Sequence, residues 1–115
     1  MKTSFSKILL SFILILSVSL SAVANDFLHN GIYYDIEDNQ LATAAVSGYT
    51  DAATGEVIIP ETVKINGKTF TVTSIKENAF AFARSVTAMR LPNTVTLISR
   101  GAFLYCSQLS DVTIP

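Results

Sequence analysis

The first apolar segment of the chain has the three-part pattern of a secretory signal peptide. Lys2 and Lys7 give a positive start, and a mostly apolar run over residues 8–20 follows. The small residues Ala22 and Ala24 then stand at positions −3 and −1 of a cleavage site. An uncleaved membrane anchor is the alternative, but a spanning helix needs about 20 apolar residues and serines interrupt this run. We therefore expect cleavage after Ala24, no membrane span in the mature chain, and export from the cytoplasm, so that the protein is secreted or lies on the cell surface or in the periplasm.

After the signal segment, short apolar runs separated by turn residues predict β-strands. The expected strands span residues 31–36, 41–46, 56–59, 63–65 and 68–72. The last two flank Asn66-Gly67, and both central residues of a type I′ turn need a positive φ angle, which Asn and Gly tolerate best. The sequence therefore predicts a β-hairpin at this point.

The second half of the chain repeats itself with a period of 23 residues. The aligned apolar positions are Ile75 with Ile98, Ala79-Phe80 with Ala102-Phe103, Phe82 with Tyr105, Ala83 with Cys106, Val86 with Leu109, Met89 with Val112, and Leu91-Pro92 with Ile114-Pro115. An earlier unit around Val57 aligns at an offset of 32, because the hairpin is inserted into it. A period of about 20–29 residues is typical of leucine-rich repeats.

Each unit predicts a short strand followed by a tight turn. Met89 and Leu91 alternate onto one face of the strand, and the proline that follows ends it because proline has no N–H to donate. Val95 and Ile98 are expected to face inward together on the next turn. The Ala-Phe pair of each unit is then expected to close the coil on a short helical turn, with the phenylalanine filling the space between coils.

These units resemble the bacterial leucine-rich repeats of the BspA type, also called the Treponema type. The resemblance rests on the pattern I-x-x-x-A-F-x-x-(C/A)-x-x-(L/V)-x-x-(V/M)-x-(L/I)-P and extends over about residues 27–115, because the preceding region resembles the N-terminal cap of secreted members. It implies a β-rich α/β repeat solenoid, right-handed, with an N-terminal β cap that includes the hairpin. The implied division is a signal peptide over 1–24, the cap with a split first repeat over 25–73, and two repeats, the second truncated, over 74–115.

The resemblance also implies a function. Members of this family are exported, surface-associated proteins that bind other proteins, some as adhesins for host matrix proteins. We therefore expect a non-enzymatic protein-binding or adhesion module whose partner is an extracellular or surface protein. Two alternatives stay open: a capping or truncated piece of a larger secreted surface protein without its own ligand, and an enzyme whose catalytic part lies downstream of Pro115.

The last coil bears on these alternatives, because its apolar face is expected to be uncovered. Solenoids normally need a capping unit at each end for solubility. Either the sequence is a piece of a longer protein, which this requirement favours, or the last coil pairs with a partner or with a second copy of the chain.

The candidate binding residues lie between the core positions of the repeat strands. They are Glu56, Ile58, Ala88, Arg90, Asp111 and Thr113. We expect them to form two ladders across the concave face, which solenoids use for binding. The alternative is that they are ordinary exposed strand residues.

Composition argues against several other functions. The chain has 115 residues and a net charge of −1, without the basic excess of a nucleic-acid-binding protein. The single cysteine cannot form a disulfide within the chain. One cysteine and one histidine are also too few ligands for a Cys- or His-based metal site. The sequence has no P-loop, G-x-S-x-G or H-E-x-x-H motif, so we expect no cofactor.

Five further residues could carry chemistry. We expect His29 to be a solvated loop residue, because no second base or nucleophile accompanies it. Cys106 is expected in the core, since it aligns with Ala83; a redox role or a disulfide-linked dimer is the alternative. Asp35, Glu37 and Asp38 lack the spacing of a calcium loop and are interpreted as part of a solvated turn.

Overall fold

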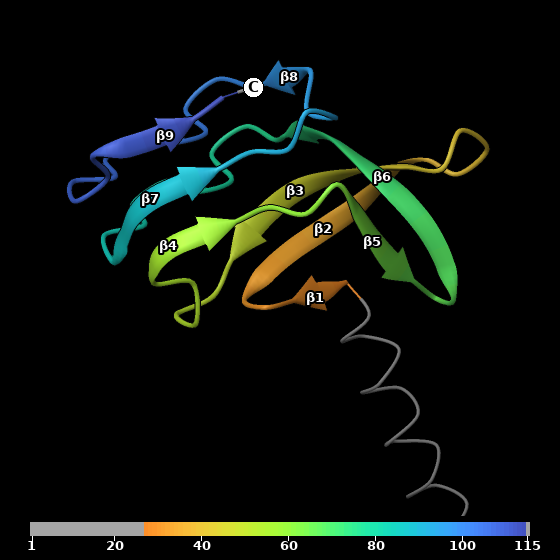
Figure 1. The fold of residues 1–115 in the computed structure, drawn as a ribbon, viewed down its shortest axis with the longest axis horizontal. Helices are drawn as coiled ribbons and strands as arrows, with labels where there is room; N and C mark the ends of the chain where they lie inside the picture. The colour runs from red at the N-terminus through yellow and green to blue at the C-terminus, as the bar shows by residue number, and fades with distance from the viewer. Residues whose placement is uncertain (1–26, 115) are drawn as a thin grey trace, which may run out of the picture.

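The computed structural model describes residues 27–114, so the signal peptide and its cleavage site lie outside the described residues. Two β-sheets make up this part (Figure 1). The first contains β1 (Leu28–His29), β2 (Ile32–Asp38), β3 (Thr43–Tyr49), β5 (Thr62–Ile65), β6 (Lys68–Ile75) and β8 (Leu97–Ile98). The second is a parallel sheet of β4 (Gly55–Ile58), β7 (Val86–Arg90) and β9 (Asp111–Thr113).

The predicted hairpin is confirmed. β5 and β6 pair antiparallel, with Ile65 opposite Lys68, so only Asn66 and Gly67 form the turn. Their φ angles are +53° and +81°. These angles are the reason for the Asn-Gly sequence, because other residues resist two consecutive positive φ values.

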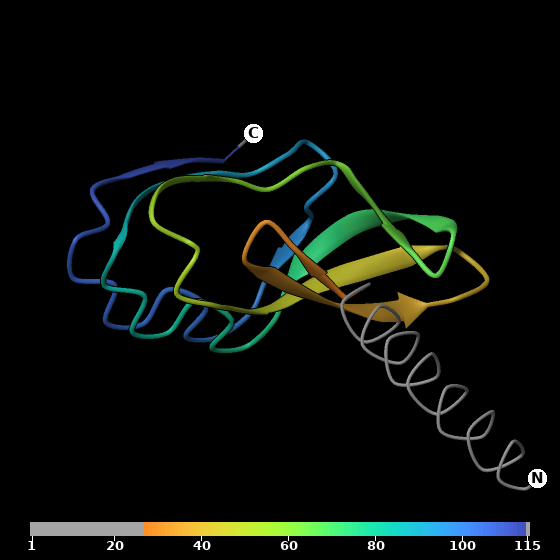
Figure 2. The same cartoon turned by 90° about the horizontal axis from the view of Figure 1, so that it is seen from below.

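The parallel sheet stacks one strand from each repeat unit in the order β4-β7-β9. In Figure 2 the successive units lie side by side, from the yellow-green β4 segment through cyan β7 to blue β9. Val57 pairs with Met89 and Met89 with Val112, so the apolar positions of successive units share one face. Pro60 and Pro92 lie just after the first two strands.

The expected helical turns are wrong: the described residues contain no helix, and this part of the protein is all-β rather than α/β. The Ala-Phe pairs lie in tight turns instead. Asn78 and Phe82 have positive φ angles of 58° and 63°, which interrupt a right-handed helix. The N–H groups of Phe80 and Phe82 donate to Ala102 and Leu104 of the next unit, at 2.8 Å each, rather than along their own segment.

A single core runs through both sheets. Phe80 is fully buried at its centre, and its ring stacks between those of Tyr49 and Phe103, with centroids 5.9 and 5.8 Å away. Tyr49 belongs to the first sheet and Phe103 to the last repeat unit. The phenylalanine of each Ala-Phe pair therefore fills the space between neighbouring units, as its size predicts.

The last described unit is less covered than the one before it. The sequence predicts that Val95 and Ile98 both face inward. Val95 packs against the core, as expected, but Ile98 is exposed, whereas its equivalent Ile75 is fully buried. Ile98 lies on β8, a strand that the sequence did not predict, and pairs with Ile75 on β6. Val112 and Ile114 are also exposed, whereas Met89 is fully buried.

Candidate functional site

The six predicted binding residues lie on one face of the parallel sheet, which we call the ladder face. Strand register places Glu56, Ala88 and Asp111 in one row, and Ile58, Arg90 and Thr113 in the other. Each strand alternates these residues with a residue that faces the core, Val57 or Met89 in the first two strands. Ile58 is 67% exposed, which is unusual for isoleucine and leaves an apolar contact point on this face.

Arg90 ties the three strands of the ladder face together. Its Nε donates to Glu56 Oε2 at 2.8 Å, its Nη2 to Asp111 Oδ2 at 2.9 Å, and its Nη1 to the Thr113 hydroxyl at 2.9 Å. The hydrogen bond and the positive charge of Arg90 lower the pKa of Asp111, and the two acids raise the pKa of Arg90. The face therefore presents an oriented cluster in which one guanidinium is shared by two carboxylates.

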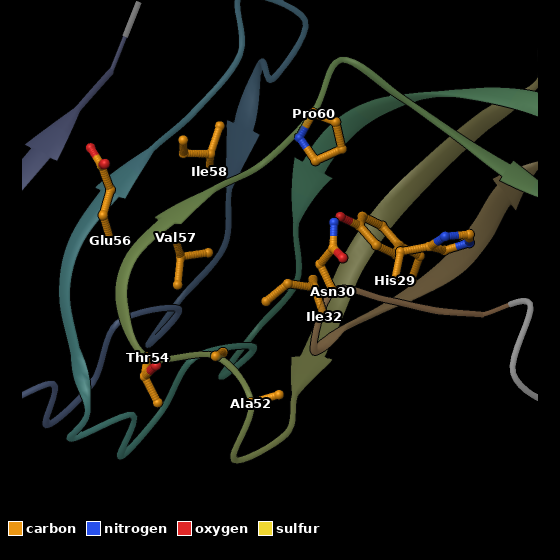
Figure 3. Close-up of a pocket in the computed structure, with 11 residues that line it drawn as sticks. His29, Asn30, Ile32, Ala52, Thr54, Glu56, Val57, Ile58 and Pro60 are labelled. Carbon is orange, nitrogen blue, oxygen red and sulfur yellow. The ribbon is translucent and has the colours of Figure 1, made fainter.

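A cleft of about 230 Å³ lies beside this face, between β4 and the β1–β2 region (Figure 3). Glu56 and Ile58 line it as well as contributing to the ladder face, so the two features meet on β4. His29 and Asn30 form the opposite side, and buried Tyr34 also lines the cleft. Burial raises the pKa of Tyr34 to about 12, so its hydroxyl stays neutral at physiological pH.

The expectation for His29 is wrong. The residue lies on β1, is half-buried, and packs edge-on against Tyr34 with ring centroids 5.9 Å apart. The cause is the antiparallel pairing of β1 with β2, which places the N-terminal segment against the sheet. A two-residue strand carries too little periodic pattern to be recognised from the sequence.

The acidic residues of the first sheet have structural partners. Asp35 accepts from Lys76 at 2.9 Å, and Glu37 accepts from the Thr73 hydroxyl at 3.2 Å. Asp38, the last residue of β2, caps a turn by accepting the N–H groups of Gln40 and Leu41, as the turn interpretation predicts. For Asp35 and Glu37 that interpretation is wrong, because both lie within β2. Within residues 27–114 no three His, Cys, Asp or Glu side chains form a group that could hold a metal ion.

Cys106 faces the core but is only half-buried. Its Sγ donates to the Phe80 carbonyl at 3.0 Å, and it packs against the core as its alignment with Ala83 predicts. Burial raises the pKa of the thiol, which disfavours the reactive thiolate.

Two aromatic residues differ from the repeat-based prediction. Phe82 and Tyr105 align at the 23-residue period with the core positions, yet they are 52% and 65% exposed and stack on each other, with ring centroids 5.2 Å apart. Both have positive φ angles, which turn their side chains outward from the tight turn. A matching period alone therefore identifies equivalent positions but not buried ones.

Comparison with known proteins agrees with this architecture. Residues 55–115 match the family described as BspA type leucine rich repeat region (6 copies). The search among curated proteins found no match. Within the described part of the chain, no helix has the length and apolar character to cross a membrane.

Three crystal structures have a similar fold. A leucine-rich repeat protein from Bacteroides ovatus is 34% identical, with a TM-score of 0.70 over 78% of this chain and 24% of its own. One from Bacteroides capillosus is 33% identical, with a TM-score of 0.65 over 73% of this chain and 61% of its own. A leucine rich cell surface protein from Faecalibacterium prausnitzii is 26% identical, with a TM-score of 0.65 over 76% of this chain and 22% of its own. The chain thus spans less than two thirds of each.

Proposed function

Because the chain belongs to the BspA type leucine-rich repeat family, we propose that it forms the N-terminal coils of a right-handed solenoid and binds an extracellular or surface protein through its ladder face. Export by the predicted signal peptide and a place at the cell surface are part of the proposal. The similar Faecalibacterium prausnitzii protein, described as a leucine rich cell surface protein, supports that location.

The single observation that carries the proposal is the arrangement of Arg90. A guanidinium held by two carboxylates and a hydroxyl has few orientations, so little conformational freedom is lost when it contacts a partner. Arginine is also among the residues that contribute most to protein interfaces. Exposed Ile58 beside it adds apolar area that can be buried.

The size of the face limits the affinity. A standard interface buries about 800 Å² on each partner. Three strands of three to five residues provide only part of that area. We therefore propose weak binding by these coils alone and tighter binding when further repeats extend the same face.

A test uses the secreted protein and a panel of purified extracellular matrix proteins immobilised on a sensor surface. Arg90→Glu places a third acid beside Glu56 and Asp111, and we expect it to abolish binding to any protein that the wild type captures. Lys64→Glu is the matched control, since Lys64 is exposed on β5 in the other sheet. Equal binding by wild type and Arg90→Glu would remove the ladder face from the proposal.

A capping role without a ligand is the second candidate. The first sheet covers one end of the repeat stack: Ile32 and Tyr34 of β2 share a buried core with Val57 of β4. A wild-type protein that folds but binds no member of the panel would favour this role.

A further inference from the structure

Strand β4 is an edge of the parallel sheet. Its residues pair with β7 on one side, and within residues 27–114 no strand pairs with it on the other. Backbone groups of a strand alternate in direction, and the N–H groups of Gly55 and Ile59 donate toward the second unit, to Ser85 and Arg90. The N–H and C=O groups of Glu56 and Ile58 therefore point to the open edge.

The cleft described above lies at this edge. Figure 3 shows Glu56 and Ile58 on one side of it and His29 and Asn30 on the other. Ile32 and Val57, both buried, contribute an apolar floor. A backbone edge with free hydrogen-bonding groups beside an apolar hollow is the arrangement that strand addition uses.

Volume and charge narrow the choice of ligand. Small-molecule pockets usually measure about 300–1,000 Å³, and this cleft of about 230 Å³ has room for one or two side chains instead. The carboxylate of Glu56 is bound by Arg90, so the rim offers no unpaired acid to attract a cation. Pro60 has no N–H group, so the pairing edge ends after Ile58.

From these observations we propose that the open edge of β4 binds an extended peptide segment as an added strand. The segment exchanges backbone hydrogen bonds with Glu56 and Ile58 and places one uncharged apolar side chain in the cleft. This contact uses the backbone edge rather than the side chains of the ladder face, so it does not rest on the proposed function.

The experiment titrates the ¹⁵N-labelled secreted protein with a capped pentapeptide made of threonines and one central valine. We expect the amide signals of Glu56 and Ile58 to shift most. The same peptide with every backbone nitrogen methylated, so that both of its edges have lost their donors, should bind at least tenfold more weakly. No protein change is needed for this comparison, so misfolding cannot affect it.

Two variants locate the contact on the protein. Ile58→Pro removes the outward N–H while sparing the groups bonded to β7, and should also weaken binding at least tenfold; Ile58→Thr keeps the N–H and should bind within about threefold of wild type. The proposal is overturned if the pentapeptide does not bind at millimolar concentration, if methylation leaves its affinity unchanged, or if the shifts fall on Arg90 and Thr113 instead. An Arg90→Gln variant that loses protein binding but keeps the peptide separates this proposal from the previous one.

Discussion

Arg90 and Asp111 form a diagonal pair across neighbouring strands. Arg90 lies in register with Thr113, whereas Asp111 is opposite Ala88, and yet the Arg90 Nη2 reaches Asp111 Oδ2 at 2.9 Å. Diagonal neighbours in a sheet are within reach of a long side chain, and the small Ala88 leaves the path open. The pair thus links the two rows of the ladder face.

The first prediction concerns the pKa of this aspartate. Arg90→Gln removes the hydrogen bond and charge that lower the pKa of Asp111, so the pKa should return toward its ordinary value of 3.8. Carboxyl ¹³C titration by NMR measures it directly. Lys64→Gln, a change on the other sheet, is the control and should leave the pKa of Asp111 where it is in wild type. An unchanged pKa of Asp111 in Arg90→Gln would contradict the assigned cause.

The same pair predicts a pH dependence of stability. A pKa lowered in the folded state contributes stability that is fully present above the unfolded value near 3.8 and is lost as the pH falls through the lower folded pKa. The melting temperature of the wild type should therefore fall further than that of Arg90→Gln as the pH is lowered from 5 to the acid limit of folding. Asp111 is exposed and Arg90 is partly exposed, so the difference should be small and should shrink further in high salt.

The third prediction compares two nearby aromatic residues, Phe80 and Phe82. Phe80 is fully buried between two rings, so Phe80→Ala should lower the free energy of unfolding by about 3–5 kcal/mol. Phe82 is half-exposed, so Phe82→Ala should cost about 1 kcal/mol or less. Urea denaturation of the purified protein measures both. Equal losses would mean that the stacked rings do not hold the units together.

Much of this fold could be predicted from the sequence because its signals are local. Two residues, Asn66 and Gly67, determine the hairpin through their tolerance of positive φ. The 23-residue period fixes the register, because strands of equal units stack with equivalent residues side by side, as Met89 and Val112 do. The positions of the six ladder-face residues follow from this register and from the alternation of each strand.

The turns could not be predicted in the same way. A segment such as 79–83 has the composition of a helix, and whether its N–H groups donate within the segment or to the next unit depends on the presence of that unit. Phe80 donates to Ala102, and this contact selects the turn. The cleft could not be predicted for a related reason: its sides come from residues 29–34 and 52–60, which belong to different sheets and meet only through the packing of the shared core.

The fourth prediction tests the hairpin turn. Gly67 has a φ of +81° and open space around its absent Cβ, so Gly67→Ala should be destabilising through the backbone alone, by about 1–2 kcal/mol. Gly48 lies within β3, and a Cβ there would make an ordinary contact with Tyr33 at 3.8 Å, so Gly48→Ala should be neutral or stabilising by up to about 1 kcal/mol. Thermal unfolding of both variants gives the comparison. A stable Gly67→Ala protein would contradict the type I′ geometry.

The last prediction concerns the reactivity of Cys106. Burial raises the pKa of its thiol, and the hydrogen bond to the Phe80 carbonyl favours the protonated form, so little thiolate is present at pH 7.5. Iodoacetamide should therefore modify the folded protein slowly, and urea should accelerate the reaction by exposing the thiol. The control moves the thiol by one residue, to exposed Ser107, as Ser107→Cys in a Cys106→Ala background, and should react at the rate of a free cysteine. If Cys106 reacts as fast as that control, the thiol is accessible, and the redox role or disulfide-linked dimer becomes the better interpretation.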